Sequence, residues 1–348
     1  MRGTLAAGNS KLMGDDEVDS LVAAKDVAAA AERLRGRVRR TPMERSPALE
    51  MRMGARVWLK CECFQETGSF KLRGALNRLL ALDDAERARG VMTVSAGNHG
   101  IGVAEAAARL GVRATVVVPE TVSPAKLHVL ERYAAGGLEL VLAGGDYDAA
   151  EAHGRALAAD RGTAFVSAYN DPWVIAGGGT TALEALEDVP DAAVMVVPVG
   201  GAGLVSGIGI WAKHARPGIR IVGVQPEASP ALRAALAARK LVTVPVEATL
   251  ADGLAGNIEA GSITWPLARR VVDDVALVSE PEIADAMRWL LTEHHMVVEG
   301  SAAVALAAVL NGRVGPIAGR SVIIVLTGRN VAYDTLRAVV ESGPTDGR

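Results

Sequence analysis

The sequence predicts an α/β protein in which buried parallel strands alternate with helices. Short runs rich in valine and isoleucine, such as ATVVVP, VMVVPVG and SVIIVLTG, have few polar interruptions, which is typical of strands buried on both faces. Helix-like segments of about 10–15 residues separate these runs. Because helical crossovers join parallel strands, we expect mostly parallel, twisted sheets that are covered by helices.

The predicted elements follow one another in a regular order. Residues 22–35 have the apolar spacing of a helix, and residues 57–63 alternate like a strand. Each later strand-like run then precedes a helix: VMTVSAG before IGVAEAAARLG, ATVVVP before SPAKLHVLERYA, LELVLAG before 147–159, AFVSA before 175–186, VMVVPVG before LVSGIGIWAKHA, IRIVGVQ before SPALRAALAA, and SVIIVLTG before a final helix. No segment repeats with a period of 20–50 residues. A chain of 348 residues is long enough for two lobes.

Composition and charge exclude several classes of function. The net charge is −3, the pI is about 6.1, and the basic residues are scattered, so we expect no nucleic-acid partner. No stretch reaches the roughly 18 uninterrupted apolar residues of a membrane span. Residues 1–20 have no apolar core of signal-peptide length. We therefore expect a cytoplasmic protein with a flexible leader over residues 1–20 and no membrane partner.

The two cysteines, Cys61 and Cys63, lie in the alternating run that begins with Val57 and Leu59. That spacing predicts that all four side chains share one face of a strand. Burial as small apolar side chains is the interpretation that we favour over metal binding. The absence of further cysteine pairs favours a reducing compartment.

The turn VGGAGL, at residues 199–204, follows a strongly apolar strand and opens a helix. Glycines let the backbone approach an anion, and free N–H groups at the helix start point toward it. Ser206 replaces the last glycine of a dinucleotide-binding fingerprint, so a cup for a single phosphate fits better. A tight turn that only packs a helix on a strand is the alternative.

Three further turns follow predicted strands, where α/β sheets bind ligands. SAGNHG, at 95–100, offers a hydroxyl, an amide and an imidazole at a helix start, and it suits a carboxylate. SAYNDP, at 167–172, supplies Asn170, and LTGRN, at 326–330, supplies Thr327. Each of the three also fits simple helix capping or turn formation.

Lys71 lies between two glycines in TGSFKLRGA, after the first predicted strand. A lysine that only lies on the protein surface does not need glycines and small polar residues around it. Together with a phosphate cup, a carboxylate-friendly turn and a hydroxyl at a strand end, it suits a phosphorylated cofactor that forms a Schiff base with lysine.

In this order, TGSFKLRGA, SAGNHG, VPVGGAGL and LTGRN resemble the fold-type II pyridoxal-phosphate enzymes, and within them the threonine/serine dehydratase and serine racemase branch. The stretches YNDPWVIAGGGT, TWPLARRVVDDV and VVEGSAAVALAA extend the resemblance from about residue 22 to about residue 340. The resemblance implies a tryptophan synthase β-like fold with two lobes. The large, cofactor-binding lobe would comprise residues 21–83 and 171–348, and the small lobe residues 84–170. It also implies a homodimer.

The resemblance assigns roles to individual residues. Lys71 would carry the cofactor and later act as the base, and Phe70 would pack near the ring. Asn98 would bond the ring hydroxyl, and Thr327 the pyridine nitrogen. Asn170 would also contact the cofactor. The phosphate would be held by Gly200, Gly201, Ala202, Gly203 and Leu204, and the substrate carboxylate by the turn of Ser95, Ala96, Gly97, Asn98 and His99.

The sequence departs from the family pattern at several positions. Ala202 stands where glycine is frequent, which we expect to be tolerated only if its φ is negative. Arg329 brings a charge close to Thr327, and it could lie in solvent or reach an acidic substrate. Gln225 replaces a glutamate that binds a divalent cation in some relatives, so we expect no metal. Ala96 replaces the serine that serves as the second acid/base group in the racemases.

These residues predict a pyridoxal-phosphate ammonia-lyase that converts L-threonine, L-serine or both to an oxo acid and ammonia. A serine racemase and a 3-hydroxyaspartate ammonia-lyase of the same fold are the enzymatic alternatives. A non-catalytic nucleotide-binding module on a doubly wound sheet is an alternative from another class.

Overall fold

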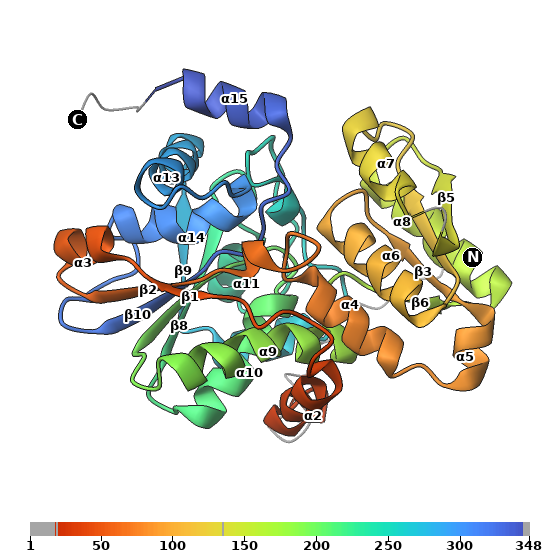
Figure 1. The fold of residues 1–348 in the computed structure, drawn as a ribbon, viewed down its shortest axis with the longest axis horizontal. Helices are drawn as coiled ribbons and strands as arrows, with labels where there is room; N and C mark the ends of the chain where they lie inside the picture. Colours follow the sequence, from red (N-terminus) through yellow and green to blue (C-terminus); the bar gives the residue numbers. More distant parts are fainter. Residues whose placement is uncertain (1–17, 19, 134–135, 344–348) are drawn as a thin grey trace, which may run out of the picture.

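The computed structural model describes residues 18, 20–133 and 136–343, and it contains two sheets with helices packed against them (Figure 1). The predicted leader, 1–20, lies almost wholly outside the described residues. The mostly parallel α/β architecture expected from the sequence is confirmed.

The larger sheet has six strands in the order β1-β2-β10-β7-β8-β9. Only the β1–β2 pair is antiparallel. The strands are β1 (Met43–Arg45), β2 (Arg56–Lys60), β7 (Val194–Pro198), β8 (Arg220–Pro226), β9 (Asp274–Val278) and β10 (Ser321–Val325). Since Val325 pairs with Lys60, the residues after β10 lie beside the segment that leads from β2 toward Lys71.

The smaller sheet has four parallel strands in the order β5-β4-β3-β6. They are β3 (Val91–Val94), β4 (Ala114–Val118), β5 (Leu138–Leu142) and β6 (Ala164–Phe165). Their valine-rich sequences are buried on both faces in β3 and β4. The helices joined to this sheet are α5 (Asp84–Arg89), α6 (Asn98–Leu110), α7 (Pro124–Glu131) and α8 (Tyr147–Arg161).

Two apolar clusters cover the two faces of the larger sheet. One joins it to α3 (Pro47–Met53), α13 (Glu280–Glu293), α14 (Gly300–Leu310) and α15 (Tyr333–Glu341). The other joins it to α2 (Ala24–Leu34), α9 (Pro172–Asp188), α10 (Gly203–Ala215), α11 (Ala231–Ala238) and α12 (Thr264–Val271). The helix α4 (Lys71–Leu80) packs on both α6 and α9, so it connects the two halves of the molecule (Figure 1).

The first predicted strand is shorter than expected. It ends at Lys60, and Cys63 lies in the short 3₁₀ turn Glu62–Phe64. The prediction that Val57, Leu59, Cys61 and Cys63 share one strand face is therefore wrong beyond Lys60. Both cysteines are nevertheless free and fully buried, as their interpretation as small apolar side chains requires. Within the described residues, every helix is too short or too polar to traverse a lipid bilayer.

Candidate active site

Lys71 is the first residue of α4, and its side chain extends among the turns that follow the strands. Its Nζ donates a hydrogen bond to the carbonyl oxygen of Ala168 at 2.9 Å and lies 5.2 Å from the centre of the Phe70 ring. Burial lowers the pKa of Lys71 to about 8, against an opposing effect of Glu299. Near that pH much of the amine is neutral, which is the nucleophilic and basic form.

The SAGNHG turn joins β3 to α6, which begins at Asn98. Its backbone is compact, since a Cβ on Gly100 would lie 2.2 Å from the carbonyl oxygen of Ser95. The Ser95 hydroxyl accepts a hydrogen bond from the Gly97 amide at 3.2 Å, and Ala96 packs against the apolar cluster around Ile101. The first amides of α6 have no acceptor within the helix, so they are available to an anion.

His99 is buried in this turn, 2% exposed, and it is uncharged. Its Nε2 donates to the carbonyl oxygen of Val166 at 3.1 Å, because a carbonyl can only accept. Burial and the charge of Lys71 lower the pKa of His99 to about 3. The imidazole therefore offers no positive charge to a substrate carboxylate, and its one proton is held by Val166.

Glu299 is a central residue of the site that the sequence analysis did not single out. Its carboxylate accepts two hydrogen bonds from Asn98 Nδ2, at 2.8 and 2.9 Å, and the Asn98 oxygen accepts one from Asn330 at 2.7 Å. Burial raises the pKa of Glu299 to about 7. A lone glutamate within the apolar run VVEGSAAVALAA was the available signal, because a carboxylate is seldom buried without a partner.

The VGGAGL turn joins β7 to α10, which begins at Gly203. Tyr169 lies directly against it. A Cβ on Gly201 would come within 2.4 Å of the Tyr169 ring, and one on Gly203 would lie 2.9 Å from the Tyr169 Cα. Only glycine fits at these two positions. Gly200 packs against the Asp252–Leu254 turn, and Leu204 is buried.

Ala202 in the same turn has a φ of 65° and is 2% exposed. The expectation that its φ would be negative is therefore wrong. The left-handed conformation costs an L-residue about 1–2 kcal/mol, and Ala202 adopts it at the N-cap of α10. The turn thus holds a strained residue at its centre, as functional loops frequently do.

Asn170 is held at both ends of its side-chain amide. Its Nδ2 donates to Glu259 Oε1 at 2.7 Å, and its Oδ1 accepts from the Ile263 amide at 3.0 Å. Glu259 also accepts a hydrogen bond from Arg155 of α8, at 3.0 Å. The loop from 259 to 263 therefore fixes Asn170 in place beside Tyr169.

Thr327 follows β10 and is 4% exposed, and its carbonyl oxygen accepts a hydrogen bond from the Phe70 amide at 3.0 Å. Ser69 pairs with Gly328 in an isolated bridge, and the buried Ser69 hydroxyl has no hydrogen-bond partner among the described residues. The LTGRN turn thus lies against the residues that precede Lys71.

Arg329 resolves one question left open by the sequence. Its side chain is exposed, and its guanidinium lies over the Phe64 ring, 5.5 Å from the ring centre. The contact is with Phe64, outside the group of Lys71, Asn98 and Glu299.

Contacts between the turns bring the four predicted motifs together. Lys71 bonds the backbone of Ala168 within SAYNDP, and His99 bonds that of Val166 just before it. Tyr169 of SAYNDP covers VGGAGL, and Asn98 of SAGNHG bonds Asn330 of LTGRN. The sequence-predicted site residues therefore line a single region where the two sheets meet.

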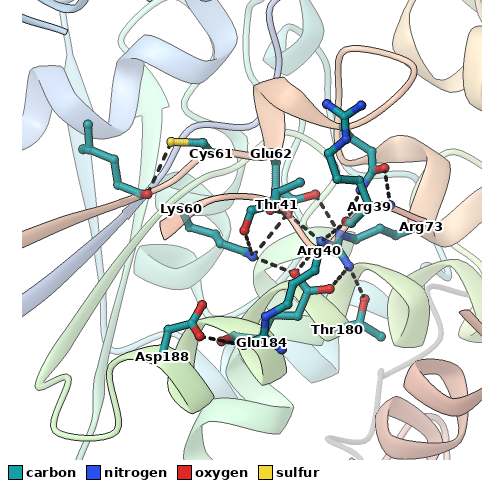
Figure 2. A network of polar contacts seen from close by, with 12 residues as sticks. Arg39, Arg40, Thr41, Lys60, Cys61, Glu62, Arg73, Thr180, Glu184 and Asp188 are labelled. Carbon is teal, nitrogen blue, oxygen red and sulfur yellow. Dashed lines mark hydrogen bonds and ion pairs between the residues drawn. The ribbon is translucent and has the colours of Figure 1, made fainter. Parts of the chain in front are cut away.

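A buried network of charges lies behind this region (Figure 2). Arg73, two residues after Lys71 on α4, bonds both oxygens of Glu62 at 2.7 and 2.8 Å and both oxygens of Glu184 at 2.7 Å. Lys60 donates to Glu184 at 2.6 Å. Two cations and two carboxylates thus compensate each other, and they tie the start of α4 to α9 and to the segment after β2.

A family model described as "pyridoxal-phosphate dependent enzyme" matches residues 34–328. The chain belongs to this family. The predicted fold-type II architecture and the pyridoxal-phosphate cofactor are therefore confirmed.

Individual relatives extend over most of the chain. An L-threonine ammonia-lyase of Geobacter sulfurreducens is 44% identical over 317 residues, which are 91% of this chain and 78% of that protein. The catabolic L-threonine dehydratase TdcB of Escherichia coli K12 is 38% identical over 314 residues, 90% of this chain and 94% of that protein. Among solved structures, maize serine racemase has a TM-score of 0.86 at 33% identity and covers 92% of this chain and 98% of its own.

The residues of the site fit pyridoxal phosphate. The Lys71 amine, whose pKa is lowered, suits Schiff-base formation with the aldehyde of pyridoxal phosphate. The glycines of VGGAGL add no side chains of their own at the start of α10, where the first backbone amides of the helix have no intrahelical acceptor and can bind a phosphate. The buried Ser69 hydroxyl and the Nδ1 atom of His99 lack partners within the described residues, so the region retains unsatisfied polar atoms where a polar ligand would lie.

Proposed function

We propose that this enzyme is an ammonia-lyase that converts L-threonine, L-serine or both to 2-oxobutanoate or pyruvate and ammonia. The observation that carries the proposal is the Lys71 amine, which has a pKa of about 8 and lies among four converging turns. The named activities of the Geobacter and Escherichia coli relatives support the same substrate class.

Lys71 is the proposed base. Pyridoxal phosphate held at Lys71 would exchange the lysine amine for the substrate's amino group, which frees Lys71, and it would withdraw electrons from the substrate's α-carbon. The neutral Lys71 Nζ then removes the α-proton, and the β-hydroxyl leaves as water. The released enamine takes up water and becomes the oxo acid and ammonia, so the reaction consumes no net water.

The other residues bind and orient. The amides at the start of α6, after Ser95, Ala96 and Gly97, would hold the substrate carboxylate, because the N-terminus of a helix favours an anion. Asn98, fixed by Glu299 and Asn330, would hold the cofactor's ring hydroxyl. The VGGAGL amides would hold the phosphate.

Phe70, Asn170 and Thr327 complete the proposed cofactor site. Phe70 would pack near the ring, and Asn170 would contact it from its fixed position. Thr327 would face the pyridine nitrogen. A neutral hydroxyl there does not fully protonate the ring, which favours prompt elimination over a long-lived carbanion.

Elimination is favoured over racemisation because the second face lacks a proton donor. Racemisation requires an acid/base group on each face of the α-carbon. Lys71 serves one face. The methyl of Ala96 cannot transfer a proton. His99 is neutral, and its one N–H donates a hydrogen bond to the Val166 carbonyl. The stacking of Arg329 on Phe64 removes the reason to favour 3-hydroxyaspartate.

Turnover of L-serine and L-threonine, followed by oxo-acid release and chiral chromatography, tests the proposal. We expect oxo acid with little D-serine from the wild type, and a rise in D-serine in Ala96→Ser. Comparable amounts of D-serine and pyruvate from the wild type would refute the lyase assignment. No oxo acid from either substrate would refute the substrate class.

We further propose the lobe boundaries of 21–83 with 171–348 and 84–170, a homodimeric enzyme and a cytoplasmic location. The smaller sheet, β3 to β6, supports the boundaries because it lies within residues 84–170. The dimer rests on the family resemblance alone, and light scattering of the purified holoenzyme tests it. The free buried cysteines support a reducing compartment.

A further inference from the structure

A cavity of about 570 Å³ lies at the edge of the smaller sheet opposite to the SAGNHG turn. Its lining includes Val91 and Ala114, the first residues of β3 and β4, and Thr163, which precedes β6. SAGNHG follows the other end of β3. The cavity is therefore separate from the site of Lys71, and it is open to solvent on one side.

The charged residues that line this basic cavity are Arg89, Arg113, Arg161 and Glu139. Glu139 accepts hydrogen bonds from Arg161, at 2.6 and 3.2 Å. Within the described part of the chain, neither Arg89 nor Arg113 bonds a carboxylate. The lining thus carries a formal charge of +2, from three guanidiniums and one carboxylate, in a chain whose net charge is −3.

Backbone contacts hold the two unpaired guanidiniums in place. Arg89 Nε donates to the carbonyl oxygen of Gly162 at 2.7 Å, and Arg113 Nη2 donates to that of Ala88 at 2.8 Å. The Val91 amide bonds the Arg113 carbonyl, so the two arginines lie at neighbouring strand starts. Both side chains are exposed, and each guanidinium keeps further N–H groups for a ligand.

The hydroxyl of Thr163 is a second feature of the cavity lining, and it carries no charge. Its hydroxyl oxygen is buried and has no hydrogen-bond partner among the described residues, although Thr163 lines the cavity. A buried hydroxyl without a partner is costly unless something else satisfies it. An anion bound between the arginines would accept its proton in a hydrogen bond once the Thr163 side chain rotates toward the cavity.

We propose that the basic cavity binds a phosphate group carried by a small molecule. A phosphate dianion has enough acceptor oxygens to take the forked N–H groups of Arg89 and Arg113 and the Thr163 hydroxyl at once. A single carboxylate has fewer acceptors and half the charge. Such a ligand would join the starts of β3, β4 and β6, and its binding is independent of the reaction at Lys71.

Calorimetric titration of the holoenzyme with inorganic phosphate, pyrophosphate and acetate, at matched ionic strength, tests the proposal. We expect one site for phosphate or pyrophosphate, and at least about tenfold weaker binding in the Arg89→Gln/Arg113→Gln double variant. The matched control is Arg52→Gln/Arg320→Gln, which removes two exposed charges outside the cavity and should bind like the wild type.

Two single variants distinguish a built site from general attraction of anions. Thr163→Val leaves the charge unchanged and should weaken phosphate about fivefold. Arg113→Lys keeps the charge but loses the planar fork, and it should also weaken binding. No binding of phosphate or pyrophosphate, equal binding of acetate, or unchanged affinity in Thr163→Val together with the double variant would overturn the proposal.

Discussion

Replacing Arg73 by methionine should destabilise the enzyme more than any exposed charge change. Arg73 is fully buried and makes four hydrogen bonds to the oxygens of Glu62 and Glu184. Without it, Lys60 is left as the cation of the network beside the buried Glu62 and the partly buried Glu184 (Figure 2). Removal of one partner from a buried ion pair costs about 3–5 kcal/mol, which is a large share of the roughly 5–15 kcal/mol that stabilises a typical protein.

Urea denaturation of wild type, Arg73→Met and Arg73→Lys measures this loss. The lysine variant should recover part of it, because an ammonium keeps the charge without the fork. Arg337→Met, which removes an exposed pair with Glu341, is the control and should change stability by less than about 0.5 kcal/mol. A loss below about 1 kcal/mol in Arg73→Met would refute the view that this network supports the start of α4.

The same comparison has a pH dependence with a defined sign. Burial raises the pKa of Glu184, but hydrogen bonds from Arg73 and the charges of Arg73 and Lys60 outweigh burial and lower it below 4.5. A lowered folded-state pKa contributes stability above the ordinary pKa, and this is lost as the pH falls through the folded value. The difference between wild type and Arg73→Met should therefore be largest above pH 4.5 and narrow below it.

Three further predictions follow from individual residues. Ala202→Gly should raise the free energy of unfolding by about 0.5–1 kcal/mol in urea denaturation, because glycine adopts a positive φ without strain, at some cost in chain entropy. A loss of stability would contradict the inference that Ala202 is strained. Chelator treatment should leave turnover nearly unchanged. The side-chain oxygen of Gln225 already accepts a hydrogen bond from the backbone N–H of Arg233 at 2.9 Å, and a side-chain amide is a poor ligand for a hard dication. A loss of turnover that magnesium restores would contradict this prediction. Glu299→Gln should stabilise the apoenzyme relative to wild type by an amount that grows as the pH rises from about 4.5 to 7, because burial raises the pKa of Glu299 and penalises its ionised form. A stability difference between variant and wild type that does not change with pH would contradict this prediction.

The alternating pattern and the four turns were readable from the sequence because they depend on local spacing. The sequence of a glycine-rich strand-to-helix turn, such as VGGAGL, predicts both the tight turn and the ability of its backbone N–H groups to approach an anion. Lys71 was recognisable because it combined with these turns in one order. The buried strands β4, β7 and β10 lie within the apolar runs that predicted them.

Features that depend on contacts between distant segments were not readable. Glu299 becomes part of the site only because Asn98, 201 residues away along the chain, donates to it. The positive φ of Ala202 follows from the way the turn meets α10, against the preference of alanine. The burial of Arg73 depends on ion pairs with Glu62 and Glu184, which lie elsewhere in the sequence.

The most direct test of the central claim is to locate the covalent attachment of pyridoxal phosphate. The holoenzyme is reduced with borohydride and digested, and mass spectrometry identifies the lysine that carries the pyridoxyl group. We predict that the label is on Lys71, with loss of the visible absorbance of the cofactor in Lys71→Ala. A label on Lys60 or Lys126 in the wild type would contradict the assignment of Lys71 and of the site built around it.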